Sequence, residues 1–251
     1  MNAGRAVGAT ELVPPPATGR TYTARRRVGL GDVDPGGRAR LDALTAYQQD
    51  VATADYESVE IGDTFAFVLR RNLVDVRIWP RLGERLELTT WAGGTGSRWA
   101  ERRTTMRGDA GAHVECAAVW VSIDTDGRPV PLPVRFVEVY GEAAGGRTVT
   151  ARLLLPDPPA DGVGRRPWAL RRSDIDTLRH VNNAAQWQAV EEIVQDLDLT
   201  DGGARPRRAE IEHRTGILPG AGTELAWSAE RGSCALWLLA DGAVATAALV
   251  T

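Results

Sequence analysis

The sequence predicts an α+β protein made of two similar halves, each with one long helix followed by antiparallel strands. Three observations support this. A short acidic motif occurs twice in the 251 residues, a helical pattern follows each copy, and four runs of strand character follow each helical pattern. A chain of this length forms one large domain or two smaller ones.

The duplication is visible in the residues themselves. Residues 28–38 align with residues 170–180 without a gap, so that Asp34 pairs with Asp176. An internal repeat of this kind predicts two copies of one structural unit.

Helices are expected over residues 41–56 and 183–197. In the second helix, Trp187, Val190 and Val194 follow the three- and four-residue steps of a single helical face. This face is expected to be buried.

Strand character and turn dipeptides alternate after each helix. One long helix can bury its apolar face only against the concave side of a curved sheet. Two such units in tandem form the arrangement called a double hotdog, with two curved antiparallel sheets each wrapped around a long helix. The expected strands are residues 65–78, 84–91, 97–106 and 113–123 in the first half, and 207–217, 223–229, 234–239 and 243–250 in the second.

Proline and glycine divide the chain into four parts. Residues 1–19 carry three consecutive prolines and no long apolar run, so a flexible tail is expected rather than a signal peptide or a membrane anchor. Residues 20–140 form the expected N-terminal hotdog, residues 141–166 a linker rich in glycine and proline, and residues 167–251 the C-terminal hotdog.

Composition excludes several classes of protein. The formal net charge is −3, without the basic excess of a nucleic-acid-binding protein. Cys116 and Cys234 are far apart and form no paired motif, so no disulfide framework is expected and a reducing cytoplasm is the expected compartment.

No metal and no cofactor are expected. His113 and His213 are single strand histidines without a cluster of metal ligands around them. The glycines at residues 29 and 31 lack the third glycine of a dinucleotide fingerprint, and no G-x-S-x-G motif of a serine hydrolase occurs.

The chemistry is expected on the turn before the second helix. Asp176 and His180 lie on this turn, and Asn182 or Asn183 is expected to cap the helix. The free N–H groups and positive dipole of a helix start favour negative charge. The backbone N–H groups from Val181 to Asn183 are therefore the expected oxyanion site.

A structural reading of the same residues stays open. Asp176 could only order the turn, and His180 could only pack beside the helix start. Asn182 could orient substrate or only cap the helix. The first copy keeps the acid as Asp34 but has Arg38 at the position of His180, as expected if only the second copy does chemistry.

These motifs resemble the acyl-acyl carrier protein thioesterases, a double-hotdog family. The similarity spans residues 22–249. It rests on Asp-Val-Asp-Pro-Gly-Gly-Arg at 32–38, Gln-Gln-Asp-Val-Ala at 48–52, and Ser-Asp-Ile-Asp-x-x-x-His-Val-Asn-Asn at 173–183.

The resemblance implies hydrolysis of fatty acyl thioesters, with acyl carrier protein as the carrier and free fatty acid as the product. It implies that Asp176 and His180 are catalytic and that the first half supplies much of the acyl pocket. The chain departs from plant members of the family at three positions. Leu178 replaces an Asn, Gly216 replaces a catalytic acid, and Gln186 replaces an aromatic residue.

The departures leave two other functions open, a non-catalytic acyl-thioester binding protein and a hotdog dehydratase. Glu210, Glu212 and His213 could substitute for the missing acid only if the strand register is shifted by a few residues.

Basic residues surround the second motif. Arg171, Arg172 and Arg179 are expected to dock the acidic carrier protein, although a solvated face in an arginine-rich chain is the alternative. No nucleic-acid partner and no membrane span are expected, and a homodimer is left open.

Overall fold

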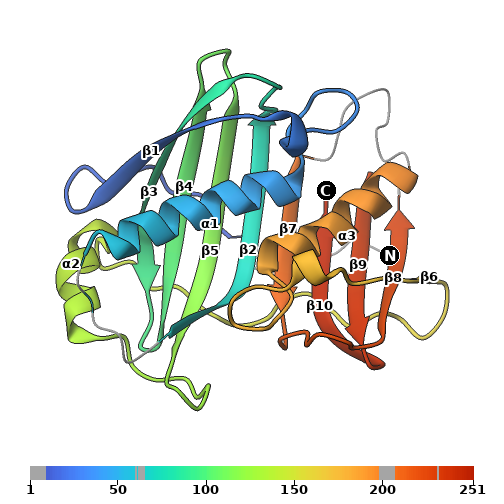
Figure 1. The fold of residues 1–251 in the computed structure, drawn as a ribbon. Helices are drawn as coiled ribbons and strands as arrows, with labels where there is room; N and C mark the ends of the chain where they lie inside the picture. The colour runs from blue at the N-terminus through green and yellow to red at the C-terminus, as the bar shows by residue number, and fades with distance from the viewer. Residues whose placement is uncertain (1–9, 60, 62–65, 198–206, 231) are drawn as a thin grey trace, which may run out of the picture.

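The computed structural model describes residues 10–59, 61, 66–197, 207–230 and 232–251 (Figure 1). Its ten strands form a single antiparallel sheet, and two long helices lie across one face of that sheet. The predicted α+β class is therefore confirmed.

The sheet runs through both halves of the chain without a break. In spatial order its strands are β1 (Thr21–Arg27), β3 (Arg85–Thr95), β4 (Trp99–Gly108), β5 (His113–Ile123), β2 (Ala66–Ile78), β7 (Arg208–His213), β10 (Ala243–Val250), β9 (Ser233–Ala240), β8 (Thr223–Glu230) and β6 (Gly164–Pro167).

The two long helices are those expected from the sequence. Helix α1 (Leu41–Glu57) and helix α3 (Asn183–Asp196) pack against each other over the middle of the sheet (Figure 1). A third helix, α2 (Val134–Ala144), packs against β3 at the end of the first half. Short 3-10 turns, η1 (Leu30–Asp32) and η2 (Arg172–Asp174), precede the two long helices.

One continuous sheet replaces the two separate sheets that the sequence predicts. Strands β2 and β7 pair antiparallel, from Arg71 opposite Glu212 to Asp75 opposite Arg208. Pairing satisfies backbone groups that each half would otherwise leave free at its sheet edge. The helices of the two halves thus meet over one shared surface.

The predicted repeat is present in the backbone geometry of the two turns. The Asp34 N–H donates to the Arg38 carbonyl oxygen (2.8 Å), and the Asp176 N–H donates to the His180 carbonyl oxygen at the same distance. The two copies therefore fold into the same turn ahead of their helices.

The apolar helix faces form the core, as predicted. Trp187, Val190 and Val194 of α3 are at most 4% exposed. Leu44 and Val51 of α1 are buried in the same hydrophobic cluster, which also contains strand residues of both halves. Burial of this shared surface holds the two halves together.

The sequence pattern does not predict α2, because prolines and glycines surround it. Pro133 occupies its N-cap. Proline lacks an N–H group, and at this position such a group would have no acceptor within the helix. Gly145 ends it in the left-handed conformation, at φ 57°. The expected linker, residues 141–166, thus overlaps the end of this helix.

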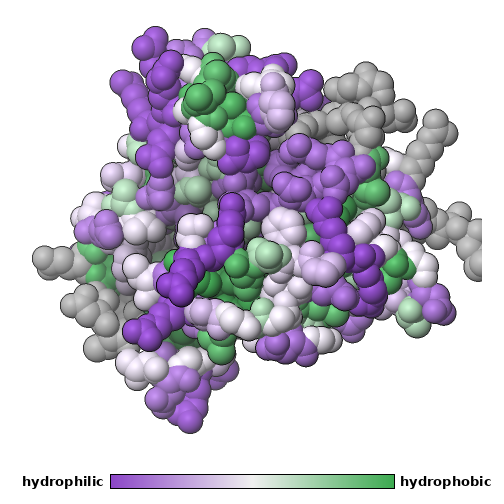
Figure 2. Space-filling model, turned by 45° about the vertical axis from the view of Figure 1, so that its right-hand side comes forward, coloured by the Kyte–Doolittle hydropathy of each residue, from purple (hydrophilic) through white to green (hydrophobic). Residues whose placement is uncertain are grey.

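The surface is mixed in character. No helix in the described ranges is long and apolar enough to cross a membrane. Figure 2 shows a face on which hydrophobic side chains lie in small groups among hydrophilic ones. Cys116 and Cys234 are both free and buried.

Candidate active site

The carboxylate of Asp176 orders the turn that carries it. Its Oδ1 accepts hydrogen bonds from the N–H groups of Leu178 (2.9 Å) and His180 (3.2 Å). Asp34 makes the equivalent bond to the Arg38 N–H (2.9 Å). Within the described part of the chain Oδ2 of Asp176 makes no hydrogen bond, so one carboxylate oxygen remains for chemistry.

The ring of His180 packs against Gly216. A Cβ atom on Gly216 would lie 2.7 Å from His180 Cδ2 and 3.1 Å from its Nε2, closer than a side chain tolerates. Gly216, where the resemblance implies an acid, therefore lies against His180. Because Gly216 has no side chain, the His180 ring occupies the space where one would lie.

Two of the three N–H groups expected to bind an oxyanion already have partners. The Val181 N–H donates to the Ile217 carbonyl oxygen (2.9 Å), and the Asn182 N–H donates to the Asp174 carbonyl oxygen (2.7 Å). Asn182 also caps the helix, because its Oδ1 accepts from the Ala184 N–H (2.8 Å). Among the described residues, only the Asn183 N–H has no partner of these three expected donors.

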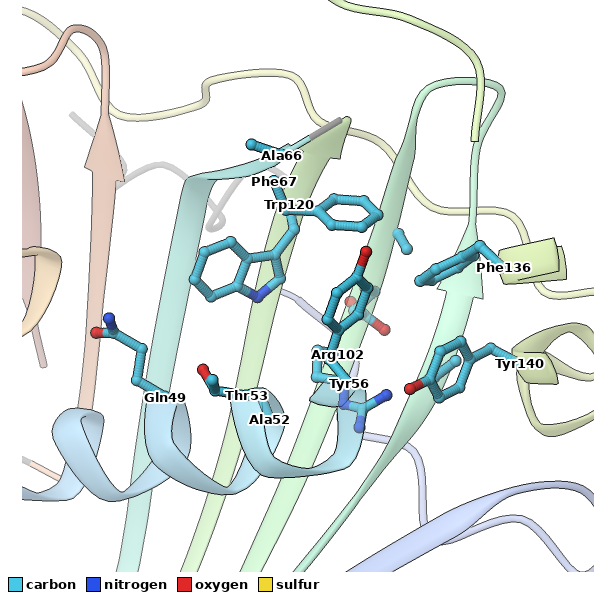
Figure 3. A pocket seen from close by; sticks show the side chains of 13 residues that line it. Gln49, Ala52, Thr53, Tyr56, Ala66, Phe67, Arg102, Trp120, Phe136 and Tyr140 are labelled. Carbon is cyan, nitrogen blue, oxygen red and sulfur yellow. The ribbon is translucent and has the colours of Figure 1, made fainter. Parts of the chain in front are cut away.

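A cavity of about 240 Å³ lies between α1, the first-half strands and α2 (Figure 3). Figure 3 shows aromatic rings from all three elements converging on it. The rings of Phe136 and Tyr140 lie 4.9 Å apart at its α2 end. Its aromatic lining consists of Tyr56, Phe67, Trp120, Phe136 and Tyr140.

A second, much smaller cavity of about 10 Å³ lies beside the first one, at the start of α3. Asn183 and Ala184 line it at the α3 side, and Gln48 and Asn72 line it from α1 and β2. The two cavities share the lining residues Gln49, Ala52, Arg102 and Trp120. The aromatic cavity thus adjoins the small cavity at the helix N-terminus.

Arg102 lines the aromatic cavity, and its charge is compensated. Burial lowers the pKa of Arg102 to about 10. Its guanidinium is paired with the buried Asp55, its Nε donates to Thr90 Oγ1 (2.9 Å), and it lies over the Tyr140 ring, 5.0 Å from the centroid. The ion pair holds α1 to the sheet floor of the cavity.

At the start of α1 the first N–H group has a side-chain acceptor, whereas no acceptor is found for the first N–H group of α3 among the described residues. Arg40 occupies the N-cap of α1 without a side-chain cap. Instead, Oε1 of Glu191 on α3 accepts from the Leu41 N–H (2.6 Å). Glu191 is 3% exposed, so a carboxylate of the second half fills the helix terminus of the first.

At the spacing of the repeat, the residue that matches Glu191 is Gln49, and the residue that matches Leu41 is Asn183. Gln49 and Asn183 line the same small cavity. An uncharged amide thus stands beside the α3 terminus, where the α1 terminus meets a carboxylate. Because a glutamine takes the place of the glutamate, the N-terminus of α3 remains available to a ligand.

The acids of β7 lie away from the turn, because successive residues of a strand point to opposite faces of the sheet. Glu210 is paired with Arg71, and Glu212 accepts the N–H groups of Leu154 (2.6 Å) and Leu155 (2.9 Å). Neither acid is placed to substitute for one at Gly216.

His213 points to the helix face of the sheet and reaches α3. Its Nδ1 lies 3.1 Å from Oε1 of Gln186, whose amide nitrogen donates to the Val181 carbonyl oxygen (3.3 Å). Since Gln186 Oε1 accepts, Nδ1 of His213 is the donor. Burial, with the nearby charge of Arg70, lowers the pKa of His213 to about 4, so this ring is neutral near pH 7.

The three arginines expected to dock a partner differ in their contacts. Nε of Arg171 donates to Asp174 (3.0 Å), which compensates its charge. Arg172 and Arg179 are exposed and form no ion pair within the described residues. Leu178 lies within the second turn and is 61% exposed, and Leu218, next to Ile217, is 58% exposed.

The structure brings some of the predicted residues together. Asn183 lines the small cavity, whereas Asp176 and His180 line neither cavity and lie on the turn that leads into α3. Across the described ranges, no group of three His, Cys, Asp or Glu residues could hold a metal ion.

Sequence reasoning singled out Gln48 and Gln49 only as part of the family resemblance, and it assigned neither them nor Asn72 to the site. The available signal was the occurrence of amides at core-facing positions of a helix and a strand, where apolar side chains are usual.

A mostly apolar cavity that adjoins a second cavity at a helix N-terminus suits a ligand with a flexible apolar chain and a polar head.

Comparison with known proteins identifies the family. The acyl-ACP thioesterase N-terminal domain model matches residues 19–139, and the C-terminal domain model matches residues 161–248. The chain belongs to the acyl-ACP thioesterase family, and it is a thioesterase that hydrolyses fatty acyl-ACP thioesters.

Individual proteins resemble the chain over most of its length. The uncharacterised protein Rv2001 of Mycobacterium tuberculosis is 28% identical over 211 residues, which is 83% of each chain. A provisionally assigned oleoyl thioesterase from Lactobacillus plantarum has a TM-score of 0.79 at 18% identity, covering 93% of this chain and 96% of that one. The 12:0-ACP thioesterase from Umbellularia californica has a TM-score of 0.75 at 19% identity, covering 92% and 96%. At these identities the two structures support the fold alone.

Proposed function

We propose that the chain hydrolyses long-chain acyl thioesters at the N-terminus of α3, with the acyl chain in the aromatic cavity beneath α1. The observation that carries this proposal is the small cavity between Asn183 and the aromatic cavity, which shares lining residues with the aromatic cavity. A thioester carbonyl at Asn183 would place its acyl chain toward the aromatic rings. Free fatty acid is the product, and no cofactor is needed.

The proposed catalytic groups are those of the second turn. The Asn183 N–H binds the carbonyl oxygen, where negative charge develops in the transition state. Asp176, through its second oxygen, acts as general base or as nucleophile, and His180 protonates the departing thiolate or polarises the carbonyl. Asn182 caps the helix that presents these groups and could also orient substrate.

The proposed architecture is a double hotdog. Helix α1 with the first-half strands forms one unit and α3 with the second-half strands forms the other, in the division 20–140 and 167–251, with a tail at 1–19 and a linker at 141–166. Support comes from the identical backbone bonds of the two turns and from the pairing of the two helices. The free, buried cysteines suit the proposed cytoplasmic location.

Acyl carrier protein is proposed to dock on the face that carries the second turn. Arg172 and Arg179 offer uncompensated positive charge, and Leu178 and Leu218 offer apolar contact beside it. Arg171, whose charge is paired with Asp174, would contribute less. Opposite charges on an acidic carrier would steer it to this face.

Hydrolysis of long-chain acyl carrier protein is expected to be at least about 10-fold faster than hydrolysis of the matching acyl-CoA at low ionic strength, because steering raises association rates. The difference should shrink as salt screens the charges. A double variant, Arg172→Glu with Arg179→Glu, should lose most of the preference, while Arg128→Glu in the turn after β5 should keep it. Equal rates on both carriers at low and high salt would remove the docking proposal and leave hydrolysis intact.

A further inference from the structure

Two amide side chains in the small cavity are buried without partners. Gln48 is 3% exposed and Asn72 is 4% exposed. Within the described part of the chain, Oε1 and Nε2 of Gln48 and Oδ1 of Asn72 make no hydrogen bond. A buried polar atom without a partner destabilises the folded state. These atoms are therefore expected to bind something polar.

The size of the small cavity limits which polar molecule Gln48 and Asn72 can bind. Its volume of about 10 Å³ is close to the space that one water molecule needs, and a buried water needs two to four polar partners. Oε1 and Nε2 of Gln48 and Oδ1 of Asn72 supply them. The site adjoins the aromatic cavity through Gln49 and Ala52, which line both.

We propose that Gln48 and Asn72 of the first half hold the water molecule that attacks the thioester. This inference rests on the proposed function, because it places the nucleophile beside a carbonyl bound at Asn183. Gln48 Oε1 and Asn72 Oδ1 accept the two water hydrogens, which leaves an oxygen lone pair free to face the carbonyl carbon.

The step is a hydrolysis that needs no further reactant. The water oxygen forms the new bond to the acyl carbon, and the C–S bond breaks with its electron pair going to sulfur. One water proton ends on the departing thiolate, so the products are a fatty acid and a free thiol. The amides orient the water and do not take its proton, since an amide oxygen is a very weak base.

The test replaces each amide by an apolar side chain of similar size, in Gln48→Met and Asn72→Leu. Loss of water positioning should lower kcat by about 10-fold to 100-fold and leave KM nearly unchanged. Replacing an unpartnered buried amide should leave Tm unchanged or raise it. A fall in kcat without a fall in Tm is a result that a structural role would not give.

Ser122→Ala is the matched control. Ser122 Oγ is also buried without a partner among the described residues, but Ser122 lines neither cavity. This variant should keep the parent kcat. If Gln48→Met and Asn72→Leu also keep the parent kcat, the water site is wrong while the proposed function stands. A parent protein that cleaves no thioester would overturn both.

Discussion

Replacement of Asp176 by Asn is expected to lower turnover of acyl thioesters by roughly 10²–10⁴ while the protein remains folded. The amide oxygen of Asn can still accept the N–H groups of Leu178 and His180 that order the turn. The variant loses only the negative charge and the basicity of the second oxygen. His180→Ala should reduce turnover comparably. Turnover is measured as free thiol released, and folding by thermal denaturation.

The first-half turn provides the control. Asp34→Asn changes an acid that makes the same bond to the N–H group four residues later, at a turn with Arg38 in place of His180. This variant should retain most of the parent turnover. Folded Asp176→Asn and His180→Ala proteins with parent rates would show that the second turn is structural, like the first.

Gln49→Glu is expected to lower turnover by about 10²–10³, the usual effect of losing one oxyanion donor. In the parent, Glu191 shows what a carboxylate does at the equivalent place, because it accepts the Leu41 N–H and closes that helix terminus. A carboxylate at residue 49 would engage the Asn183 N–H in the same way. It would also repel the negative charge that develops on the carbonyl oxygen.

Glu191→Gln is the matched variant at the closed terminus. It removes the charge but keeps an oxygen for the Leu41 N–H, and it lies away from the proposed reaction centre, so its turnover should stay within a few-fold of the parent. A Gln49→Glu protein that works at the parent rate would show that the Asn183 N–H does not bind the reacting carbonyl.

Local patterns predict most of the helices and strands. Strand β5 occupies residues 113–123 as predicted, and α1 ends one residue beyond the predicted residue 56. These segments are predictable because alternation along a strand and steps along a helix each mark a buried face. Helix α2 is not predictable in this way, since its proline and glycine signals are equally typical of a loop.

The union of the two halves depends on contacts between distant residues. Backbone pairing of β2 with β7, in which Arg71 lies opposite Glu212, joins the strands of the two halves. Packing of α1 against α3 places Gln49 and Asn183 at the same small cavity. No periodicity within one segment carries this information. The repeat does carry part of it, because its spacing matches Gln49 to Glu191 and so marks a position where the two halves differ in charge.

The predicted turn and the predicted helix cap are present in the structure, whereas the catalytic roles of their residues stay predictions. The motif places Asp176 and His180 on a turn ahead of a capped helix, as the structure has them. It could not indicate that the Val181 N–H bonds to Ile217, since that contact comes from a segment following β7. The oxyanion proposal is therefore narrowed to Asn183.

The central claim is that the protein cleaves the thioester, and one measurement tests it most directly. Purified protein is incubated with excess long-chain acyl carrier protein, and free thiol and free fatty acid are both measured over time. The account predicts equal amounts of the two products and many turnovers per protein molecule. Binding of the acyl carrier protein without release of thiol or fatty acid would contradict it. The chain would then be an acyl-thioester binding protein, with Gly216 in place of the acid and Leu178 in place of the Asn as the residues to restore first.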